Sequence, residues 1–488
     1  MNFFKSRINE HGENDFISKV VVATSAAVLF FIAMVTSSNF GVRMPEQNNL
    51  SFFGNPNTYL ALVLTALFIG AIAIFLFQPK ANLVSFLFVI MMVAGLMAAR
   101  GMLLNFVSGD YLSHLSRWMT GIRAHDGLDA LGDASISNYS PPYMYILWIL
   151  ARFTTPDYLP NVDIATIKFV SILFDVILAY FVMKIVSLKY DSVNVKILAF
   201  VAVLAIPTVL FNSALWAQSD SIYAAFAIGA IYFGLKKQSV QSLVFFALAF
   251  SFKMQAVFIL PIIVIFIIKN HIKPVHLWVP FAVFGGLLIP SILAGMLPSE
   301  ALGVYFGQFD YYVRINMNSP NIWALINGLD GLAGLRRGDV NIHTMYVVRE
   351  HLISAGIFAA GVATVAFVYS LTTMRDFIKT NAQWVQVAYL SVAILPFLLP
   401  KMHDRYFFIA DVLAVVLFIY CRKFWYVPLV TILASFTTYT AFLFHGERAF
   451  SIQIVSLALL VVIILVLKDL IQGLLAAKRE LPKLQAEQ

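Results

Sequence analysis

The chain has little cysteine and little charge, and each shortage narrows the class of protein. One cysteine, Cys421, stands among 488 residues, which excludes an internal disulfide and a cysteine-based metal site. Charged residues make up 12% of the sequence, against roughly 25% in soluble proteins. Because 60% of the residues are hydrophobic, we expect an all-α polytopic membrane protein, since only helices satisfy the backbone of such apolar runs in lipid.

Familiar sequence motifs are missing as well. No glycine-rich phosphate loop is present, so a cytosolic nucleotide-driven reaction has no support. The sequence has no fixed-period repeat and no low-complexity tract. The apolar run Val20–Val35 lacks a convincing small-residue cleavage site, so we expect a retained first span and not a cleaved signal peptide.

Candidate metal ligands show no diagnostic spacing. Asp110, His114, His125, His403 and Asp404 are available, but none forms a pattern such as His-Glu-x-x-His. We therefore assign no metal-binding residues. Two separated loops can still build an oxygen-rich site, so a divalent cation such as Mg²⁺ or Mn²⁺ stays open as a cofactor.

The positive charge follows the membrane topology. A formal net charge of +8 suits a nucleic-acid partner, but the basic residues lie mainly in short loops between apolar runs. That distribution is the positive-inside pattern, so we expect a lipid bilayer and no nucleic acid as partner.

Counting apolar runs of about 20 residues predicts about fourteen spans, within a range of twelve to fourteen. Two large outer loops, 107–162 and 299–349, separate groups of spans. The first loop contains Tyr143–Phe153, which is too short to cross and should form a short interfacial helix. The predicted full spans are 20–40, 57–78, 82–106, 163–186, 195–213, a sixth that ends before Lys236, 276–298, 350–371, 383–400, 405–421, 425–444 and 449–468.

A break is expected within the remaining apolar segment. Only about 30 residues separate the inside loops at Lys236–Lys237 and Lys269–Lys273, whereas two full crossings need about 40. We therefore predict two half-length helices that meet at Phe252–Gln255, facing a cavity or protein. A single tilted helix with misassigned loops is the alternative.

Five polar clusters interrupt the apolar sequence, and the topology places all of them on the outer face. Charged and amide groups near hydrocarbon are expensive, so their convergence predicts a reaction site. The clusters are Gly109–Tyr111 with Asn138–Tyr143, Trp216–Asp220, Phe252–Gln255, Met317–Asn321 and Lys401–Tyr406.

Asp110 is the candidate base. It directly follows the third span, and a carboxylate beside a low-dielectric wall can serve as a general base or can orient a neighbour. We expect Asp126, Asp129 and Asp133 in the same loop to be solvated.

Tyr139 and Tyr143 flank a stiff Ser-Pro-Pro turn. We favour a hinge that seats the following apolar segment, although the tyrosine faces can also stack on a sugar ring.

Lys401, His403 and Arg405 gather at the outer end of a span, against the positive-inside rule. Arginine offers a planar fork for phosphate and lysine a point charge. Snorkelling to lipid headgroups is the alternative. A phosphate-bearing ligand that enters from the outer leaflet would account for these side chains.

As a set, these residues resemble the bacterial members of the GT-C glycosyltransferase superfamily, of a mannosyltransferase-like type. The resemblance rests on Asp110-Tyr111, Trp118, Asn-Tyr-Ser-Pro-Pro-Tyr, Trp-x-Gln-x-Asp, Ser-Phe-Lys-Met-Gln, Met-Asn-x-Pro-Asn and Lys-Met-His-Asp-Arg-Tyr. Asp404 stands where the family usually has glutamate. The resemblance implies a catalytic core over 82–411, two extra N-terminal helices over 1–81, and C-terminal helices with a basic cytoplasmic tail over 412–488.

The resemblance also implies a function. An inverting enzyme of the bacterial inner membrane would transfer a hexose from a polyprenyl-phosphate donor to a glycan, glycolipid or protein acceptor on the periplasmic or exterior side. Asp110 would be the base. Lys253, Lys401, His403 and Arg405 would hold the donor phosphate. The implied substrate-binding residues are Tyr139, Tyr143, Trp216, Gln218, Asp220, Gln255, Asn318, Asn321 and Asp404.

Two other functions stay open. Broken helices and charges in the membrane also suit a secondary transporter, although no internal repeat is evident. A glycan polymerase or ligase that acts on lipid-linked sugars would likewise work at the outer face.

Overall fold

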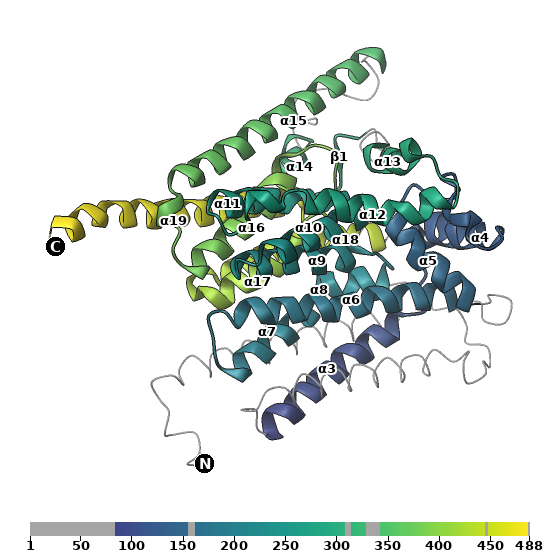
Figure 1. Ribbon diagram of the computed structural model, residues 1–488, viewed down its shortest axis with the longest axis horizontal. Helices are drawn as coiled ribbons and strands as arrows, with labels where there is room; N and C mark the ends of the chain where they lie inside the picture. The colour runs from purple at the N-terminus through teal and green to yellow at the C-terminus, as the bar shows by residue number, and fades with distance from the viewer. Residues whose placement is uncertain (1–82, 155–161, 308–313, 328–341, 445–447, 487–488) are drawn as a thin grey trace. The chain divides into compact units, whose positions relative to one another are not determined.

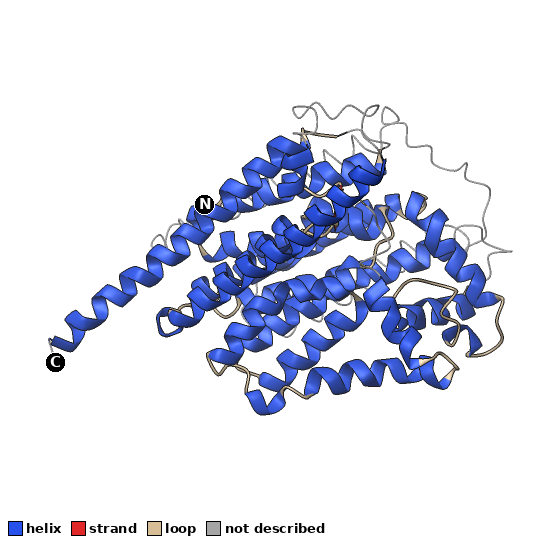
Figure 2. Ribbon diagram, turned by 90° about the horizontal axis from the view of Figure 1, so that it is seen from above, coloured by secondary structure: helices blue, strands red, loops and turns tan. Residues whose placement is uncertain are grey.

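A computed structural model describes residues 83–154, 162–307, 314–327, 342–444 and 448–486 (Figure 1). The first two predicted spans, and with them the region 1–81, lie outside the described residues. The described chain is about 79% helical, with 17 α-helices, and helices dominate the view in Figure 2. The all-helical class is therefore confirmed. The strands in the described part are β1 (Asn316–Met317) and β2 (Met402–His403), which pair in parallel.

The chain divides into two compact units, which are described separately. The first comprises the described residues up to Ala124 together with Leu147–Ala225, and the second comprises His125–Ile146 and the residues from Phe226 onward. Helices α5 (Pro141–Phe153) and α9 (Asp220–Leu235) continue from one unit into the other. The other elements of the first unit are α3 (Leu83–Leu103), the π-helix η3 (Tyr111–Leu115), α4 (Ser116–Arg123), α6 (Val162–Val186), α7 (Val193–Ala205), α8 (Pro207–Leu210) and the π-helix η5 (Phe211–Leu215).

The second unit holds the remaining helices. Its longer ones are α10 (Ser239–Phe252), α12 (Val279–Leu293), α13 (Pro298–Gly307), α15 (Ile342–Thr373), α16 (Asn381–Leu398), α17 (Phe408–Tyr420), α18 (Tyr426–Leu443) and α19 (Ile452–Ala486). The shorter ones are α11 (Leu260–Ile268), α14 (Ile322–Asn327) and the 3₁₀ turns η4 (Asp129–Leu131), η6 (Met254–Ile259), η7 (Pro274–His276), η8 (Arg375–Phe377) and η9 (Arg422–Phe424).

Six helices in the described part are long and apolar enough to cross a membrane. A seventh span exists if α7 and the following Pro207–Leu215, bent by 55°, are counted as one. Four further apolar helices, α9, α10, Met254–Ile268 and α17, have only 10–17 residues; at 1.5 Å per residue they reach about 20–25 Å, short of a hydrocarbon core of about 30 Å. The structure thus supports a multi-pass membrane protein, while fourteen spans stays a prediction. The spans predicted at 163–186 and 383–400 correspond closely to α6 and α16.

The predicted break near Phe252–Gln255 is confirmed. Helix α10 ends at Phe252, Lys253 is extended with φ −156° and ψ 127°, and the 3₁₀ turn η6 leads into α11. The backbone N–H of Lys273 donates to Oγ of Ser239 across 2.9 Å, so the chain returns to the point where α10 began. The segment is a hairpin of two short helical arms with Lys253 between them.

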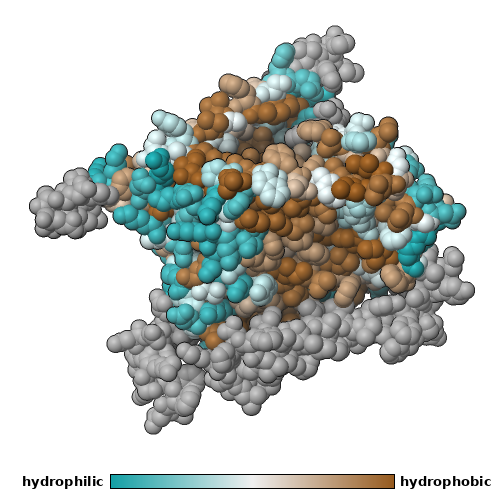
Figure 3. All heavy atoms as spheres, viewed as in Figure 1, coloured by the Kyte–Doolittle hydropathy of each residue, from teal (hydrophilic) through white to brown (hydrophobic). Residues whose placement is uncertain are grey.

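The outer surface of α12 and α15 is apolar, as Figure 3 shows. Phe281 and Leu293 on α12 are 78% and 82% exposed, and Phe358 and Val365 on α15 are 74% and 69% exposed. Large exposed apolar surfaces are rare in water-soluble monomers, so these helices are suited to contact lipid tails.

Candidate functional site

In the first unit, two N–H groups converge on one oxygen of Asp110. Trp216 Nε1 donates to Asp110 Oδ2 across 2.9 Å, and Gln218 Nε2 donates to the same oxygen across 2.6 Å. Trp216 is fully buried and Gln218 is 7% exposed, whereas Asp110 is half-buried. Hydrogen bonds to an ionised acceptor are roughly twice as strong as neutral ones, so the pair fixes the carboxylate in one orientation.

The loop that supplies these donors has a constrained backbone. Ala217 adopts φ +66°, a left-handed conformation that costs a non-glycine residue about 1–2 kcal/mol. Backbone bonds hold it: the N–H of Trp216 donates to Phe211 O across 2.8 Å, and that of Gln218 to Asn212 O across 2.9 Å. The carbonyl oxygen of Trp216 accepts from Ser108 Oγ at 2.7 Å, which ties the loop to the segment that carries Asp110.

Asp220 lies behind this loop. Its side chain is 1% exposed and accepts a hydrogen bond of 2.7 Å from Asn212 Nδ2, both residues being buried. Asp220 therefore closes the loop at its base through its bond with Asn212.

Lys168 anchors the segment that precedes Asp110. Its side chain is fully buried in α6, and Nζ donates to the carbonyl oxygens of Leu103, Leu104 and Phe106 across 2.8, 3.1 and 2.7 Å. These carbonyls follow the last turn of α3, where a helix leaves carbonyls without intrahelical donors and favours a cation.

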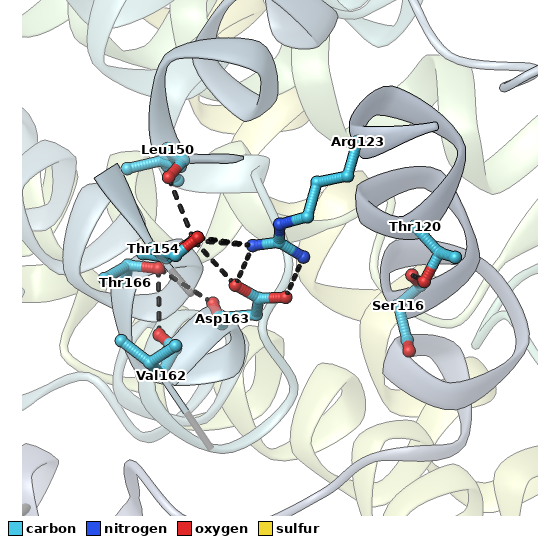
Figure 4. Close-up of polar contacts among 8 residues, drawn as sticks. All are labelled: Ser116, Thr120, Arg123, Leu150, Thr154, Val162, Asp163 and Thr166. Atoms are coloured by element: carbon cyan, nitrogen blue, oxygen red, sulfur yellow. Dashed lines mark hydrogen bonds and ion pairs between the residues drawn. The ribbon is translucent and has the colours of Figure 1, made fainter. Parts of the chain in front are cut away.

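A second clamp holds the end of α4, as Figure 4 shows. Arg123 donates to both oxygens of Asp163 across 2.7 and 2.6 Å and to Thr154 Oγ1 across 2.6 Å. Burial raises the pKa of nearby Tyr111 to about 12, and the charge of Asp163 acts in the same direction. Tyr111 therefore stays a neutral phenol beside the candidate base.

In the second unit, Lys253 lies beside the tyrosine turn. Its Nζ is 5.9 Å from the ring centroid of Tyr139, a cation–π distance. The rings of Tyr139 and Tyr143 are 4.9 Å apart. Ser140 Oγ donates to Phe252 O across 2.8 Å, so the turn is fastened to the end of α10 and shares its position with Lys253.

His403 lies within the electrostatic reach of Lys253 and Arg405. Burial lowers the pKa of His403 well below its ordinary value, and the charges of Arg405 and Lys253 lower it further. Burial is the larger cause of the lowered pKa, and the smaller one is the pair of positive charges, which favours an anion nearby. The structure thus brings together Lys253, His403 and Arg405, three of the four residues predicted to bind phosphate.

The fourth, Lys401, and Asn318 lie at the strand pair. Lys401 has φ +58° and its N–H donates to Ile315 O across 2.6 Å. Asn318 bridges to His403 through the backbone, donates from Nδ2 to Thr438 O across 3.1 Å, and accepts from Arg448 Nη2 at 2.9 Å. These bonds fasten the outer loop around Asn318 to the segment that carries His403.

Three other predicted substrate-binding residues are buried in this unit. Asn321 is fully buried and caps α14, accepting from the N–H of Trp323 at 3.0 Å and donating to Leu399 O across 3.2 Å. Asp404 is 4% exposed and its carbonyl accepts from Thr438 Oγ1. Gln255 is 7% exposed, and among the described residues no group donates to its Oε1. Asn321 is thus engaged in loop structure, while Gln255 keeps an acceptor for a ligand.

No group of three or more His, Cys, Asp or Glu side chains gathers within the part of the chain that the structure describes. The groups bound to Asp110 Oδ2 are N–H donors, which do not coordinate a cation.

Several residues at the site were missed by sequence reasoning. Lys168 and Asp175 lie within an apolar run, and charged residues inside a span are usually functional or paired, so this signal could have found them. Ser108, Asn212 and Thr438 carry no such signal, because isolated hydroxyl and amide residues are common in loops. Neither a family model nor a curated protein matches the chain.

Proposed function

We propose that this chain is an integral membrane glycosyltransferase of the GT-C type. It transfers a hexose from a polyprenyl-phosphate donor to an acceptor hydroxyl, with inversion, on the extracytoplasmic face of a bacterial inner membrane. The observation that carries the proposal is the half-buried carboxylate of Asp110, oriented by Trp216 Nε1 and Gln218 Nε2.

Asp110 is the general base. Two donors fix its orientation before substrate arrives, which is what a base needs if it is to meet a hydroxyl proton in the right direction. The acceptor O–H bond breaks, its proton passes to the carboxylate, and the oxygen attacks the anomeric carbon from the face opposite the phosphate.

The positive charges of Lys253 and Arg405 serve the leaving group, and His403, which burial and those two charges keep neutral, lies beside them. As the anomeric C–O bond breaks, its electron pair stays on the phosphate oxygen, and polyprenyl phosphate departs. Fixed positive charges at a partly dry site stabilise that developing charge. Phosphate leaves without a proton, so a second, acidic carboxylate is not required, in contrast to glycoside hydrolysis.

Tyr139 supplies a ring face for the sugar, supported from behind by the buried ring of Tyr143, and Gln255 Oε1 supplies an acceptor for one of its hydroxyls. Aromatic faces with polar tips suit pyranose rings.

The test is sugar transfer by purified protein from synthetic polyprenyl-phosphate hexoses, with native membrane extract as the acceptor source. Asp110→Asn should lower the rate by about 10²–10⁴-fold, the usual contribution of general acid–base catalysis. Asp126→Asn is the matched control, since Asp126 is exposed in the following loop. Equal loss in both variants, or none in Asp110→Asn, contradicts the assignment of the base.

One observation favours a second candidate, a secondary transporter. The α10–α11 hairpin and the 55° bend after α7 are discontinuous helices, which transporters use to bind substrates. Uptake of water-soluble solutes that carry no polyprenyl chain into proteoliposomes, with no transfer of sugar from any polyprenyl-phosphate donor, would favour that function.

A further inference from the structure

Asp175 lies beneath the loop that supplies the donors to Asp110, in the first unit. Its carboxylate is fully buried in α6 and is bound from two sides of that loop. Ser213 Oγ, three residues before Trp216, donates to Oδ2 across 2.6 Å, and Ser221 Oγ, three residues after Gln218, donates to Oδ1.

Arg100 completes the arrangement from the side of α3. Its Nε and Nη2 lie 3.1 and 3.0 Å from Asp175 Oδ2, and Nη2 also donates to Leu204 O across 3.0 Å. Asp175 is thus joined to α3, which leads to Asp110, and to both ends of the segment 213–221, called the donor loop here because its Trp216 and Gln218 donate hydrogen bonds to Asp110.

We propose that Asp175 is a positioning residue that sets the distance between Asp110 and its two donors, through Ser213 and Ser221. The strained backbone at Ala217 needs such a restraint, because relaxation of its positive φ would carry Trp216 and Gln218 away from the carboxylate. The inference rests on the proposed function for its catalytic consequence, but not for the geometry itself.

The two serines separate positioning from mere structural support. A Ser213→Ala/Ser221→Ala variant leaves Arg100 and Asp175 in place and removes both serine links to the carboxylate, together with the 3.1 Å bond from Ser213 Oγ to Val209 O in the preceding turn. The matched control is Ser391→Ala/Ser456→Ala, two buried serines whose hydroxyls donate to carbonyls of their own helices across 2.8 and 2.6 Å.

The first readout does not depend on activity. Protein labelled with 5-fluorotryptophan gives one ¹⁹F resonance for each of seven tryptophans, and Trp216→Phe identifies that of Trp216. The Asp110→Ala variant supplies the position of an indole that has lost its acceptor. In the Ser213/Ser221 double variant the Trp216 resonance should move toward that position, and in the control it should stay.

The second readout is kinetic. Misplacement of a catalytic geometry by about 1 Å can cost about 100-fold, so kcat of the double variant should fall by roughly 10–100-fold with KM little changed. A Trp216 resonance at the wild-type position overturns the proposal, as does an unchanged kcat. If the double variant does not fold, each single variant should show part of the same resonance shift, and its absence in both is equally contradictory.

The two proposals fail separately. Absence of sugar transfer by the wild type from every donor removes the proposed function, while the ¹⁹F result still decides whether Asp175 positions the donor loop.

Discussion

The side-chain ammonium of Lys168 donates to the carbonyl oxygen of Leu103 across 2.8 Å, joining the second turn of α6 to the last residue of α3. The same nitrogen binds two more carbonyls in the segment that leads to Asp110. One buried cation therefore both ends a helix and directs the chain that follows it.

Lys168→Met should destabilise the protein by about 2–4 kcal/mol, because three buried carbonyl oxygens lose a charged donor at once. Equilibrium unfolding in mixed detergent–SDS micelles measures this loss. Lys236→Met is the control: Lys236 is exposed, and surface substitutions usually stay within about 0.5 kcal/mol. Equal stability of the two variants would show that the cap contributes nothing.

Gln218→Met should slow sugar transfer by roughly 10–150-fold, the equivalent of about 1.5–3 kcal/mol for a hydrogen bond to a charged group. Methionine keeps the length of the side chain but cannot donate to Asp110. Initial rates at saturating donor report the change in kcat. Gln241→Met, at an exposed position of α10, should retain the wild-type rate, and a Gln218→Met enzyme with full activity would refute the role of this donor.

Acidification should destabilise the protein through His403. The folded state lowers the pKa of His403, whereas a histidine in an unfolded chain titrates near 6.5. Below about pH 6.5 the unfolded state therefore binds more protons at His403 than the folded state does. The contribution of His403 to the free energy of unfolding is fully present above that pH and decreases as the pH falls.

The slope from this one group is at most about 1.4 kcal/mol per pH unit. Melting temperatures of the wild type and His403→Asn from pH 8 to pH 5 test it. The difference between the two proteins should be constant above pH 7.5 and should shift in favour of the variant as the pH drops. Parallel curves over the whole range would argue against a buried neutral histidine.

Two glycines of α15 should respond in opposite directions to alanine. A Cβ at Gly356 would lie 2.2 Å from Cζ2 of Trp323, whereas a Cβ at Gly361 meets no atom within 4 Å. The indole is held by a 2.8 Å bond from its Nε1 to Leu398 O. Gly356→Ala should therefore destabilise by about 1–3 kcal/mol through overpacking.

Gly361→Ala should stabilise by up to about 1 kcal/mol, because alanine is the better helix former. Thermal unfolding in one detergent compares the two variants directly. A change of the same sign in both would mean that helix propensity, and not the contact with Trp323, governs this face of α15.

Local patterns predicted the parts of the fold that depend on local physics. The bounds of α6 follow from the length of an apolar run, and the break at Lys253 follows from counting residues between basic loops. The number of spans could not be settled in this way, because helices such as α9, with 16 residues, fall between a full crossing and a buried core helix.

Some residues of the candidate site could likewise be predicted from the sequence, and others could not. The position of Asp110 at the end of a span and the family resemblance singled out Asp110, Trp216 and Gln218, which the structure joins through one carboxylate oxygen. Arg100 pairs with Asp175, 75 positions away, and the residues next to each of them in the sequence do not indicate which distant residue is the partner. The sequence also does not show that the side chain of Asn321 caps α14. An asparagine that binds a sugar would lie in a similar polar segment.

The α10–α11 hairpin also constrains the order in which the chain can assemble. Its extended residue, Lys253, interrupts the backbone hydrogen bonds between two arms that are each too short to cross lipid alone. The arms pack against α12 and α16, which leave the ribosome later. We therefore expect the hairpin to reach its final place in the membrane only after α12 and α16 have been synthesised and can cover its two arms.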